Sequence, residues 1–461
     1  MKVVRDSKYR HVWGEPSKNI YADLRVSNKA TESYGIRANG KYILLAWEAG
    51  NGSALAPIPV EKSGRLPRDL PLLTGHCGPV LDFEFNPFNE DQCLSCSEDL
   101  TIKLWDLPEG GLKTNLKEST LTLEGHGKKV TFCTFNPVVD GIFASAAYDQ
   151  TIRTWSIDNQ EEAYKVDIPE QAWSLKWNWT GSLLAFTSKD KMMHIVDPRA
   201  KSIALSTKIH DGSKASKVQW IGSSLSGDEC QKIVTTGFST QAERHIMYWD
   251  MRKFGDASKE TCDPLNTLQL DQGTGALYPH FDDGSMTLWI TGKGDGNCRY
   301  FEAVPEDPYL HFLSQYGTSV PQKGFCFIPK KNVDVGKHEI MRGLKLESNQ
   351  IVPISFKVPR KSEMFQEDIF PDCYAGVPAM NGDKWMSGNE SALPVMQSMK
   401  PGAASAKGVT KAAVKSVKEL KADLAAAEAK IEALEKENAA LKAEVAKLKG
   451  QNEIPKEAPK E

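Results

Sequence analysis

The chain has 461 residues, of which 40% are hydrophobic and 25% charged, and its formal net charge is −3. These values are typical of a folded globular protein, and a charge so close to balance gives no general reason to expect a nucleic-acid partner. No apolar run reaches the roughly 18 residues of a membrane span, and the N-terminus lacks the apolar stretch of a signal peptide, so we expect a cytoplasmic protein.

The first clear elements lie in two stretches that repeat one another without a gap. Residues 75–106 (GHCGPVLDFEFNPFNEDQCLSCSEDLTIKLWD) align with residues 125–156 (GHGKKVTFCTFNPVVDGIFASAAYDQTIRTWS). Within each unit apolar residues alternate with polar ones, as at Leu81, Phe83 and Phe85. This period of two predicts short antiparallel strands joined by turns.

A Gly-His start and a Trp-Asp end are the signature of WD repeats, so this region resembles a β-propeller. Burial of a His and an Asp is tolerable when each satisfies the other by a hydrogen bond. We therefore expect the His of each unit to bind the Asp that lies six residues before the Trp, with the Trp covering the pair. The predicted networks are His76, Asp99 and Trp105 in one unit, and His126, Asp149 and Trp155 in the next.

Weaker copies of the unit extend the repeat in both directions, for example at Trp47, at Asp190 with Val196, and at Trp249-Asp250. From residue 29 to residue 359 there is room for seven units of roughly 45 to 50 residues. A strand near residues 9–13 is expected to pair with the last blade and close the ring. The predicted fold class is all-β, with a seven-bladed WD-repeat propeller at residues 1–359.

Two motifs inside this region could suggest chemistry. Residues 292–302 (GKGDGNCRYFE) resemble a phosphate loop, but Asp295 stands six residues before Phe301, and a strand pattern follows where a phosphate loop would open a helix. We therefore predict a blade turn with Asp295 in the structural network. Cys93 and Cys96 form a CxxC pair with no second pair at zinc spacing, which favours buried free thiols over a metal site.

The composition changes after Trp385. Residues 387–416 are rich in Ser, Gly, Ala, Pro and Lys, which predicts a flexible linker. Residues 417–449 carry an unbroken heptad pattern, which predicts a coiled-coil helix, and residues 450–461 are expected to be disordered. The predicted contact positions are Val417, Leu424, Ile431, Asn438 and Val445 at a, and Leu420, Ala427, Leu434, Leu441 and Leu448 at d.

The heptad residues favour a parallel homodimer, because β-branched residues at a with Leu at d prefer two strands and a single Asn at a sets the register. A trimer is the next alternative, since residues 430–435 (KIEALE) come close to a trimer-favouring motif. That motif has Arg at its first place, and Lys lacks the bidentate guanidinium. Antiparallel forms remain open.

A propeller followed by a linker and a short coiled coil resembles coronin, an actin-binding WD-repeat family. The resemblance rests on several stretches together and covers residues 2 to about 386. They are KYRHVWG near the start, YADLRVS at 21–27, GKGDGNCRYFE, PYLHFLSQY at 308–316, and VPRKSEMFQEDIFPD at 358–372. By this resemblance we expect residues 360–386 to pack back on the propeller.

The resemblance implies binding of filamentous actin by the propeller, with Arg25 as the family's contact arginine. Residues 1–29 hold seven Lys or Arg against three Asp or Glu, and such a basic patch could steer encounter with an acidic filament. We add Lys8, Arg10 and Lys18 as candidate actin-binding residues. The alternative is that Arg25 is an ordinary exposed arginine or pairs with Asp23 inside the blade.

In this family the coil also contacts the actin-related-protein complex that nucleates filament branches, which makes that complex a second candidate partner. The expected function is therefore a cytoskeletal regulator at the cell cortex that organises or bundles filaments. The competing hypothesis is a scaffold for peptides or membrane-traffic partners, because a fold does not determine a function. No GxSxG, HExxH or Walker motif is present, so we expect no catalysis, cofactor or metal.

Overall fold

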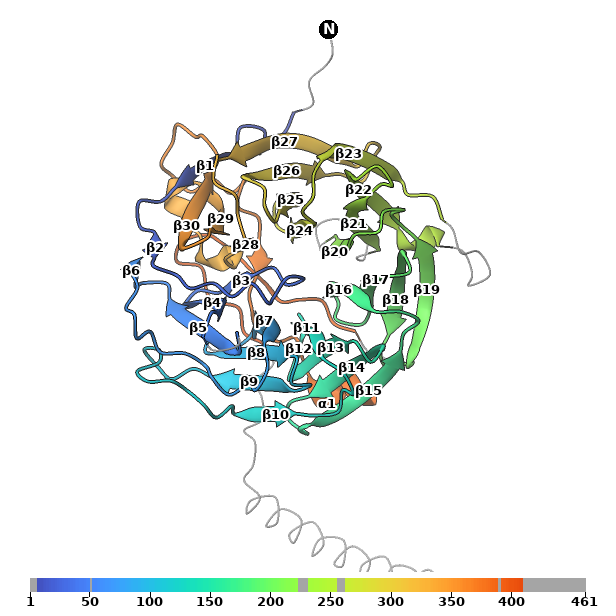
Figure 1. The fold of residues 1–461 in the computed structure, drawn as a ribbon. Coiled ribbons are helices and arrows are strands. Elements are labelled where there is room, and N and C mark those ends of the chain that lie inside the picture. Colours follow the sequence, from blue (N-terminus) through green and yellow to red (C-terminus); the bar gives the residue numbers. More distant parts are fainter. Residues whose placement is uncertain (1–5, 50–51, 223–230, 255–261, 389–390, 409–461) are drawn as a thin grey trace, which may run out of the picture. The chain divides into compact units, whose positions relative to one another are not determined.

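Seven β-sheets stand around a central axis like the blades of a propeller in the part of the chain that the structure describes (Figure 1). The structure is a computed structural model that describes residues 6–49, 52–222, 231–254, 262–388 and 391–408. These residues belong to one unit, Met1–Val409. The predicted coiled coil and tail, including every a and d position named above, lie outside the described residues.

Five blades are four-stranded antiparallel meanders whose first strand lies innermost. Blade 2 holds β7 (Val80–Phe85), β8 (Gln92–Ser97), β9 (Ile102–Asp106) and β10 (Leu121–Leu123). Blade 3 holds β11 (Val130–Phe135), β13 (Ile142–Ala147), β14 (Thr151–Ser156) and β15 (Glu161–Asp167). Blade 4 holds β16 (Ala172–Trp177), β17 (Leu184–Ser188), β18 (Met192–Asp197) and β19 (Ser202–Lys208).

The next two blades follow the same order. Blade 5 holds β20 (Lys217–Ile221), β21 (Lys232–Phe238), β22 (Glu243–Asp250) and β23 (Asn266–Gln272), with a 3-10 turn η1 (Met251–Lys253) between the last two. Blade 6 holds β24 (Leu277–Asp282), β25 (Thr287–Gly292), β26 (Asn297–Ala303) and β27 (Leu310–Gly317). The strand predicted after the GKGDG turn is thus confirmed as β26.

Blades 1 and 7 differ from the others. Blade 1 has three strands, β3 (Ile36–Ala38), β4 (Tyr42–Trp47) and β5 (Ala54–Pro59), among the described residues. Blade 7 holds β28 (Gly324–Phe327), β29 (Glu339–Leu346) and β30 (Gln350–Lys357), with the turns η2 (Lys330–Asn332) and η3 (Val335–Lys337) between the first two. Its outer strand comes from the N-terminus, as β1 (Trp13–Pro16) and β2 (Tyr21–Ala22), and β6 (Gly64–Arg65) pairs with β2.

The ring therefore closes as predicted, but with a different segment. The strand expected near residues 9–13 begins only at Trp13, where Trp13 pairs with Lys357. Tyr9 and Val12 instead pack into the apolar cluster between blades 6 and 7. The hydroxyl of Tyr9 donates to the carbonyl of Ile369 at 3.3 Å. Residues 8–11 form a turn that brings both side chains into the interior, so no strand forms before Trp13.

Each apolar cluster of the described core lies between two neighbouring blades. Leu94, Cys96 and Ile102 of blade 2, for example, pack on Cys133 and Phe143 of blade 3. A single blade exposes both faces and cannot bury them alone, so stacking of adjacent sheets supplies the core. Both cysteines of the CxxC pair are buried with free thiols, Cys96 in this cluster and Cys93 in the one between blades 1 and 2, and burial raises the pKa of each.

The two ends of the strands define two faces of the ring, which we name for later use. The loops between second and third strands, such as residues 98–101 and 293–296, form the top face. The loops between first and second strands, such as residues 136–141 and 283–286, form the bottom face. Successive strands are antiparallel, so these two sets of loops lie at opposite ends.

The segment after the last blade crosses the bottom face. It contains β31 (Cys373–Tyr374), β32 (Met380–Asn381) and the six-residue helix α1 (Gly382–Ser387), and β32 pairs with β12 (Val139–Asp140) of blade 3. Trp385 is 1% exposed, and its indole N–H donates to the Gly181 carbonyl of blade 4 at 3.1 Å. Within the described part of the chain, no helix is long and apolar enough to cross a bilayer.

Part of the segment predicted as a flexible linker is ordered. Residues Met396–Gln397 form β33, which pairs with β31, and the Ala375 N–H donates to the Val395 carbonyl at 2.9 Å. Met399 packs against the cluster between blades 6 and 7. The predicted boundary at residue 386 therefore falls too early, because a few apolar residues among the polar ones suffice to dock this stretch.

Candidate functional site

Arg25 lies on the top face, where the outer strand of blade 7 ends. This strand runs along β30, from Trp13 opposite Lys357 to Ala22 opposite Gln350. β30 has 8 residues, so the climb from the bottom face to the top face covers roughly 25 Å. Lys8 and Arg10 precede this climb, Lys18 lies within it and Arg25 follows it. The structure therefore does not bring the four predicted binding residues together.

The backbone around Arg25 is held on both sides. Its carbonyl accepts from the Glu48 N–H at 2.7 Å, and the buried Leu24 donates its N–H to the Asn349 carbonyl at 3.0 Å. The next residue, Val26, forms a β-bridge with Trp47. Leu24 faces the core between blades 1 and 7. The neighbouring Arg25 is therefore turned outward, and its side chain is exposed.

The guanidinium of Arg25 makes no hydrogen bond or ion pair with any described residue. The alternative that it pairs with Asp23 is wrong, because Asp23 binds Arg65 at 2.7 Å across the β2–β6 pair. Both of those side chains are themselves largely exposed. Arg25 therefore presents a charge with all of its hydrogen-bond donors available to a partner.

The chain that follows Arg25 reaches across the top face to other blades, and we call residues 30–34 the top strap. The ammonium of Lys217 in blade 5 contacts the Glu32 carboxylate at 2.8 Å. Ser33 donates to Asp82 of blade 2 at 2.7 Å. In blade 6, the hydroxyl of Tyr278 donates to the Thr31 carbonyl at 3.3 Å. Contacts to three other blades give the segment that carries Arg25 a rigid support.

Lysine 293, from the GKGDG turn, also belongs to this support. Its ammonium donates to the carbonyls of Thr31 at 2.6 Å and Ala30 at 3.2 Å. Burial, followed by the nearby charge of Lys217, lowers the pKa of Lys293 to about 7. The turn that could be taken for a phosphate loop therefore anchors the top strap.

The other three candidate binding residues occupy different surroundings. Lys8 donates to the Asp368 carbonyl at 3.2 Å, beside the segment that crosses the bottom face. Arg10 and Lys18 are exposed, and neither side chain has a hydrogen bond or ion pair with a described residue. They can add to the general positive field but not to a contact centred on Arg25.

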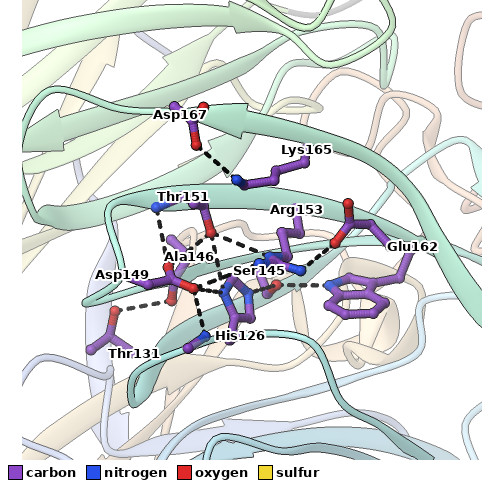
Figure 2. Close-up of polar contacts among 12 residues, drawn as sticks. His126, Thr131, Ser145, Ala146, Asp149, Thr151, Arg153, Glu162, Lys165 and Asp167 are labelled. Atoms are coloured by element: carbon purple, nitrogen blue, oxygen red, sulfur yellow. Dashed lines mark hydrogen bonds and ion pairs between the residues drawn. The ribbon is translucent and has the colours of Figure 1, made fainter.

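The predicted His and Asp side chains meet on the top face in blades 2 and 3, and Figure 2 shows the group of blade 3. His126 Nδ1 lies 3.0 Å from Asp149 Oδ2, and the corresponding distance from His76 to Asp99 is 2.8 Å. Burial opposes ionisation of Asp149, but hydrogen bonds from the Gly127 N–H and from His126 outweigh it and lower its pKa.

Sequence reasoning missed the residue that joins Trp to this network. The hydroxyl of Ser145 lies 2.7 Å from His126 Nε2 and accepts from the Trp155 indole N–H at 2.8 Å. Ser95 plays the same part in blade 2, with both distances at 2.8 Å. A signal was present, because each Ser stands four residues before the Asp in both repeats.

Other blades keep part of the network. In blade 5, Thr235 takes the place of Ser and accepts from Trp249 at 2.8 Å, while His210 Nε2 lies 3.0 Å from the same hydroxyl. Burial, with a smaller contribution from His245, lowers the pKa of His210 to about 3. In blade 4, Asp190 lies in the turn before β18 and approaches His194 of that strand at 3.6 Å.

Asp295 does not join a His network, which corrects the prediction. Its carboxylate binds Arg244 of blade 5 at 2.7 Å, and Arg244 also binds Asp271 through two contacts of 2.6 and 2.8 Å. Arg299 completes the group at 2.5 Å from Asp271. The unit has no Gly-His start, so the turn aspartate ties two blades together by an ion pair instead.

Sequence profiles of known families match the N-terminal part, blades 2 and 3, and the end of blade 7 with the segment that follows it. Sequence profiles described as "WD domain, G-beta repeat" cover residues 68–106 and 117–156, and one described as "Type of WD40 repeat" covers 351–393. Residues 2–65 match a "Domain of unknown function (DUF1899)". The match at residues 351–393 spans β30 and part of the bottom-face segment together.

Several curated proteins are similar over most of the chain. Coronin-A of Dictyostelium discoideum is 37% identical over 393 residues, which cover 85% of each chain. Human Coronin-2A is 34% identical, with 86% of this chain and 75% of that protein covered. A coronin-like protein of Saccharomyces cerevisiae is 35% identical over 87% of this chain, which spans 61% of that longer protein.

Among solved structures, the WD40 domain of Toxoplasma gondii coronin superposes with a TM-score of 0.79 at 40% identity. The match covers 85% of this chain and 98% of that domain.

Proposed function

The chain belongs to the coronin family, and from this premise we propose that it binds filamentous actin through a top-face site centred on Arg25. The observation that carries the proposal is the exposed guanidinium, which has no partner among the described residues and stands on a supported backbone. The proposed activity is binding without catalysis, in the cytoplasm and at the cell cortex.

The chemistry suits an acidic polymer. A guanidinium offers five donors in a planar fork that matches a carboxylate, and arginine is often a dominant contact in interfaces. Because the backbone at Arg25 is already held by its neighbours, binding costs mainly the rotamer freedom of this one side chain. Lys18, Lys8 and Arg10 lie along the outer strand or beyond it, and in our proposal they contribute only long-range attraction that salt weakens.

We further propose that residues 417–449 self-associate, as a parallel dimer first and as a trimer next. Two linked propellers would bind one filament, or two filaments, far more tightly than a single propeller does. Filament bundling or organisation would follow from this avidity. Contact with the branch-nucleating complex is the further step that the family resemblance suggests for the coil.

Co-sedimentation with actin filaments at low and moderate salt tests the site. We expect the full-length chain to pellet and Arg25→Asp to pellet much less at either salt. Lys18→Asp is the matched control, since it makes the same charge change at an exposed position without a partner in the described chain. If both variants lose filament binding equally, the binding depends on overall positive charge and not on a contact at Arg25. If the unmodified chain stays in the supernatant, actin is not the partner, and the scaffold hypothesis takes its place.

A further inference from the structure

A cavity of about 460 Å³ lies in the middle of the ring, toward the bottom face. Its walls come from the inner strands and first loops of several blades and from the segment that crosses the bottom face. They include Tyr34 of the top strap and Tyr374 of that bottom segment. This volume falls in the range of small-molecule sites and far exceeds the space that one ordered water needs.

Positively charged and nitrogen-bearing side chains converge at one end of this cavity, around the ring of Tyr34. The Arg37 guanidinium carbon lies 4.1 Å from the ring centre and the Lys176 ammonium 5.0 Å from it. The His280 ring packs edge-on against the same tyrosine, at 4.8 Å between centroids. These residues come from blade 1 (β3), blade 4 (β16) and blade 6 (β24), so only the closed ring assembles the group.

The hydrogen-bonding capacity of this group is largely unused. Lys176 makes no hydrogen bond or ion pair with any described residue. The Nε2 atom of His280 is buried without a hydrogen-bond partner in the described chain. Arg37 donates to the Phe83 carbonyl at 3.3 Å and reaches Glu84 only at 3.9 Å.

The described lining of the cavity holds four cations and four carboxylates, and these charges are paired unevenly. Lys330 binds Asp282, and Lys331 lies 3.4 Å from Glu90, so these charges offset one another. Arg37 and Lys176 are left with Glu84, which Arg37 reaches at 3.9 Å, and with Asp283. Burial, and then the neighbouring Asp282, raises the pKa of Asp283, which favours its neutral form.

The same two cations also act on His280. Burial lowers the pKa of His280, and the charges of Arg37 and Lys176 lower it further. A neutral imidazole beside these two cations can still donate one hydrogen bond to an anion.

We propose that this cavity binds a small molecule that carries a phosphate group, held by Arg37 and Lys176 with His280 as an additional donor. Arg37 and Lys176 are partly buried and incompletely paired, which is costly for a cation, and a bound dianion reduces that cost. Arginine suits the planar, bidentate face of a phosphate, and lysine adds a point charge. A bare phosphate would leave most of the cavity empty, so a phosphate ester fits it better.

Because Tyr374 forms part of the wall, a ligand would also stabilise the docked bottom segment. The Tyr374 hydroxyl donates to the Pro137 carbonyl at 2.7 Å, which fixes this tyrosine beside blade 3. Anything that binds only the closed cavity shifts the equilibrium toward the docked state. Saturating ligand should therefore slow proteolytic cleavage within residues 360–388 several-fold.

Calorimetric titration of the full-length chain at constant ionic strength tests the proposal. The probes are inorganic phosphate, glucose 6-phosphate, glucose and acetate. We expect saturable binding of both phosphates, tighter for the ester, with none for glucose. Lys176→Gln should weaken phosphate binding about tenfold or more, the loss expected of one charge-assisted hydrogen bond. Lys176→Arg should retain it, and Lys18→Gln on the outer strand should leave it unchanged.

The opposite results would overturn the proposal. These are no saturable binding of either phosphate up to about 20 mM, acetate binding as tight as phosphate binding, or equal affinity in Lys176→Gln. A thermal melt of each variant separates a lost site from a lost fold. Actin co-sedimentation of Lys176→Gln should match that of the unmodified chain, so failure here is distinct from failure of the site at Arg25.

Discussion

Each face of the ring is crossed by a length of chain that lies outside the blades, and the two crossings are built differently. The top strap, residues 30–34, is held by polar contacts, such as Lys217 to Glu32 and Ser33 to Asp82. The segment at residues 373–385, which we call the bottom strap, buries Met380 and Trp385 in the core between blades 3 and 4. Apolar burial favours stability, whereas a polar crossing leaves charged side chains near the surface for a partner.

The largest expected effect comes from removing the apolar anchor of the bottom strap. Trp385 packs against Trp177 and Tyr164, with ring centres 6.0 Å away in each case. We expect Trp385→Ala to lower the free energy of unfolding by about 3–5 kcal/mol, since a large buried side chain is lost and a cavity remains. Urea denaturation measures this change, and limited proteolysis shows whether the strap detaches first.

Leu393→Ala is the control for that change, because Leu393 follows the bottom strap but is 57% exposed. It should alter stability by less than about 0.5 kcal/mol. If Trp385→Ala also left the free energy of unfolding almost unchanged, apolar burial would not be what holds the bottom strap.

A smaller effect is expected from the polar anchor of the top strap. Lys217 is 3% exposed at its side chain and donates to the Glu32 carboxylate, the Glu32 carbonyl and the Trp173 carbonyl. We expect Lys217→Met to cost about 1–3 kcal/mol of unfolding free energy, because these acceptors lose their donor. The exposed Lys214, changed to Met, should cost almost nothing. A loss as large as that of Trp385→Ala would mean that the top strap is part of the main core.

The same ion pair should make the top strap sensitive to acid. Burial by itself would raise the pKa of Glu32, but the charge of Lys217 outweighs it and holds that pKa below its ordinary value. A depressed carboxyl pKa stabilises the folded state above the ordinary value and loses this effect as the pH falls through the folded-state value.

The effect is modest, because the Glu32 side chain is 41% exposed and solvent screens it. The stability difference between the unmodified chain and Lys217→Met should therefore shrink between pH 7 and about pH 3. Denaturant unfolding at several pH values measures it. A difference that does not change with pH would show that the pair contributes through packing alone.

The smallest expected effect on stability belongs to Arg25. Its side chain is exposed and has no partner in the described chain, so Arg25→Asp should change the free energy of unfolding by less than about 0.5 kcal/mol. The same variant should lose most of its filament binding. A clear drop in the melting temperature of Arg25→Asp would show that Arg25 stabilises the fold. The loss of filament binding could then no longer be attributed to a direct contact between Arg25 and actin.

Local regularity explains why so much of the blade architecture was predictable. The period of two and the repeated spacing of His76, Asp99 and Trp105 with His126, Asp149 and Trp155 predict both the strands and the hydrogen bonds that the structure shows. The prediction from spacing failed at Asp295, because Asp295 pairs with Arg244, which lies 51 residues earlier on another blade. A pattern within one unit carries no information about that neighbour.

The sequence by itself predicted a seven-bladed ring, because two clear repeats set the length of a unit, the chain has room for seven such units, and each blade needs neighbours to bury its two faces. It also singled out Arg25, through its resemblance to a family. Only the tertiary structure decided that Lys8, Arg10 and Lys18 lie away from Arg25, and that Arg37, Lys176 and His280 meet around Tyr34. These groupings depend on contacts between residues that are distant along the chain and are set only when the ring closes.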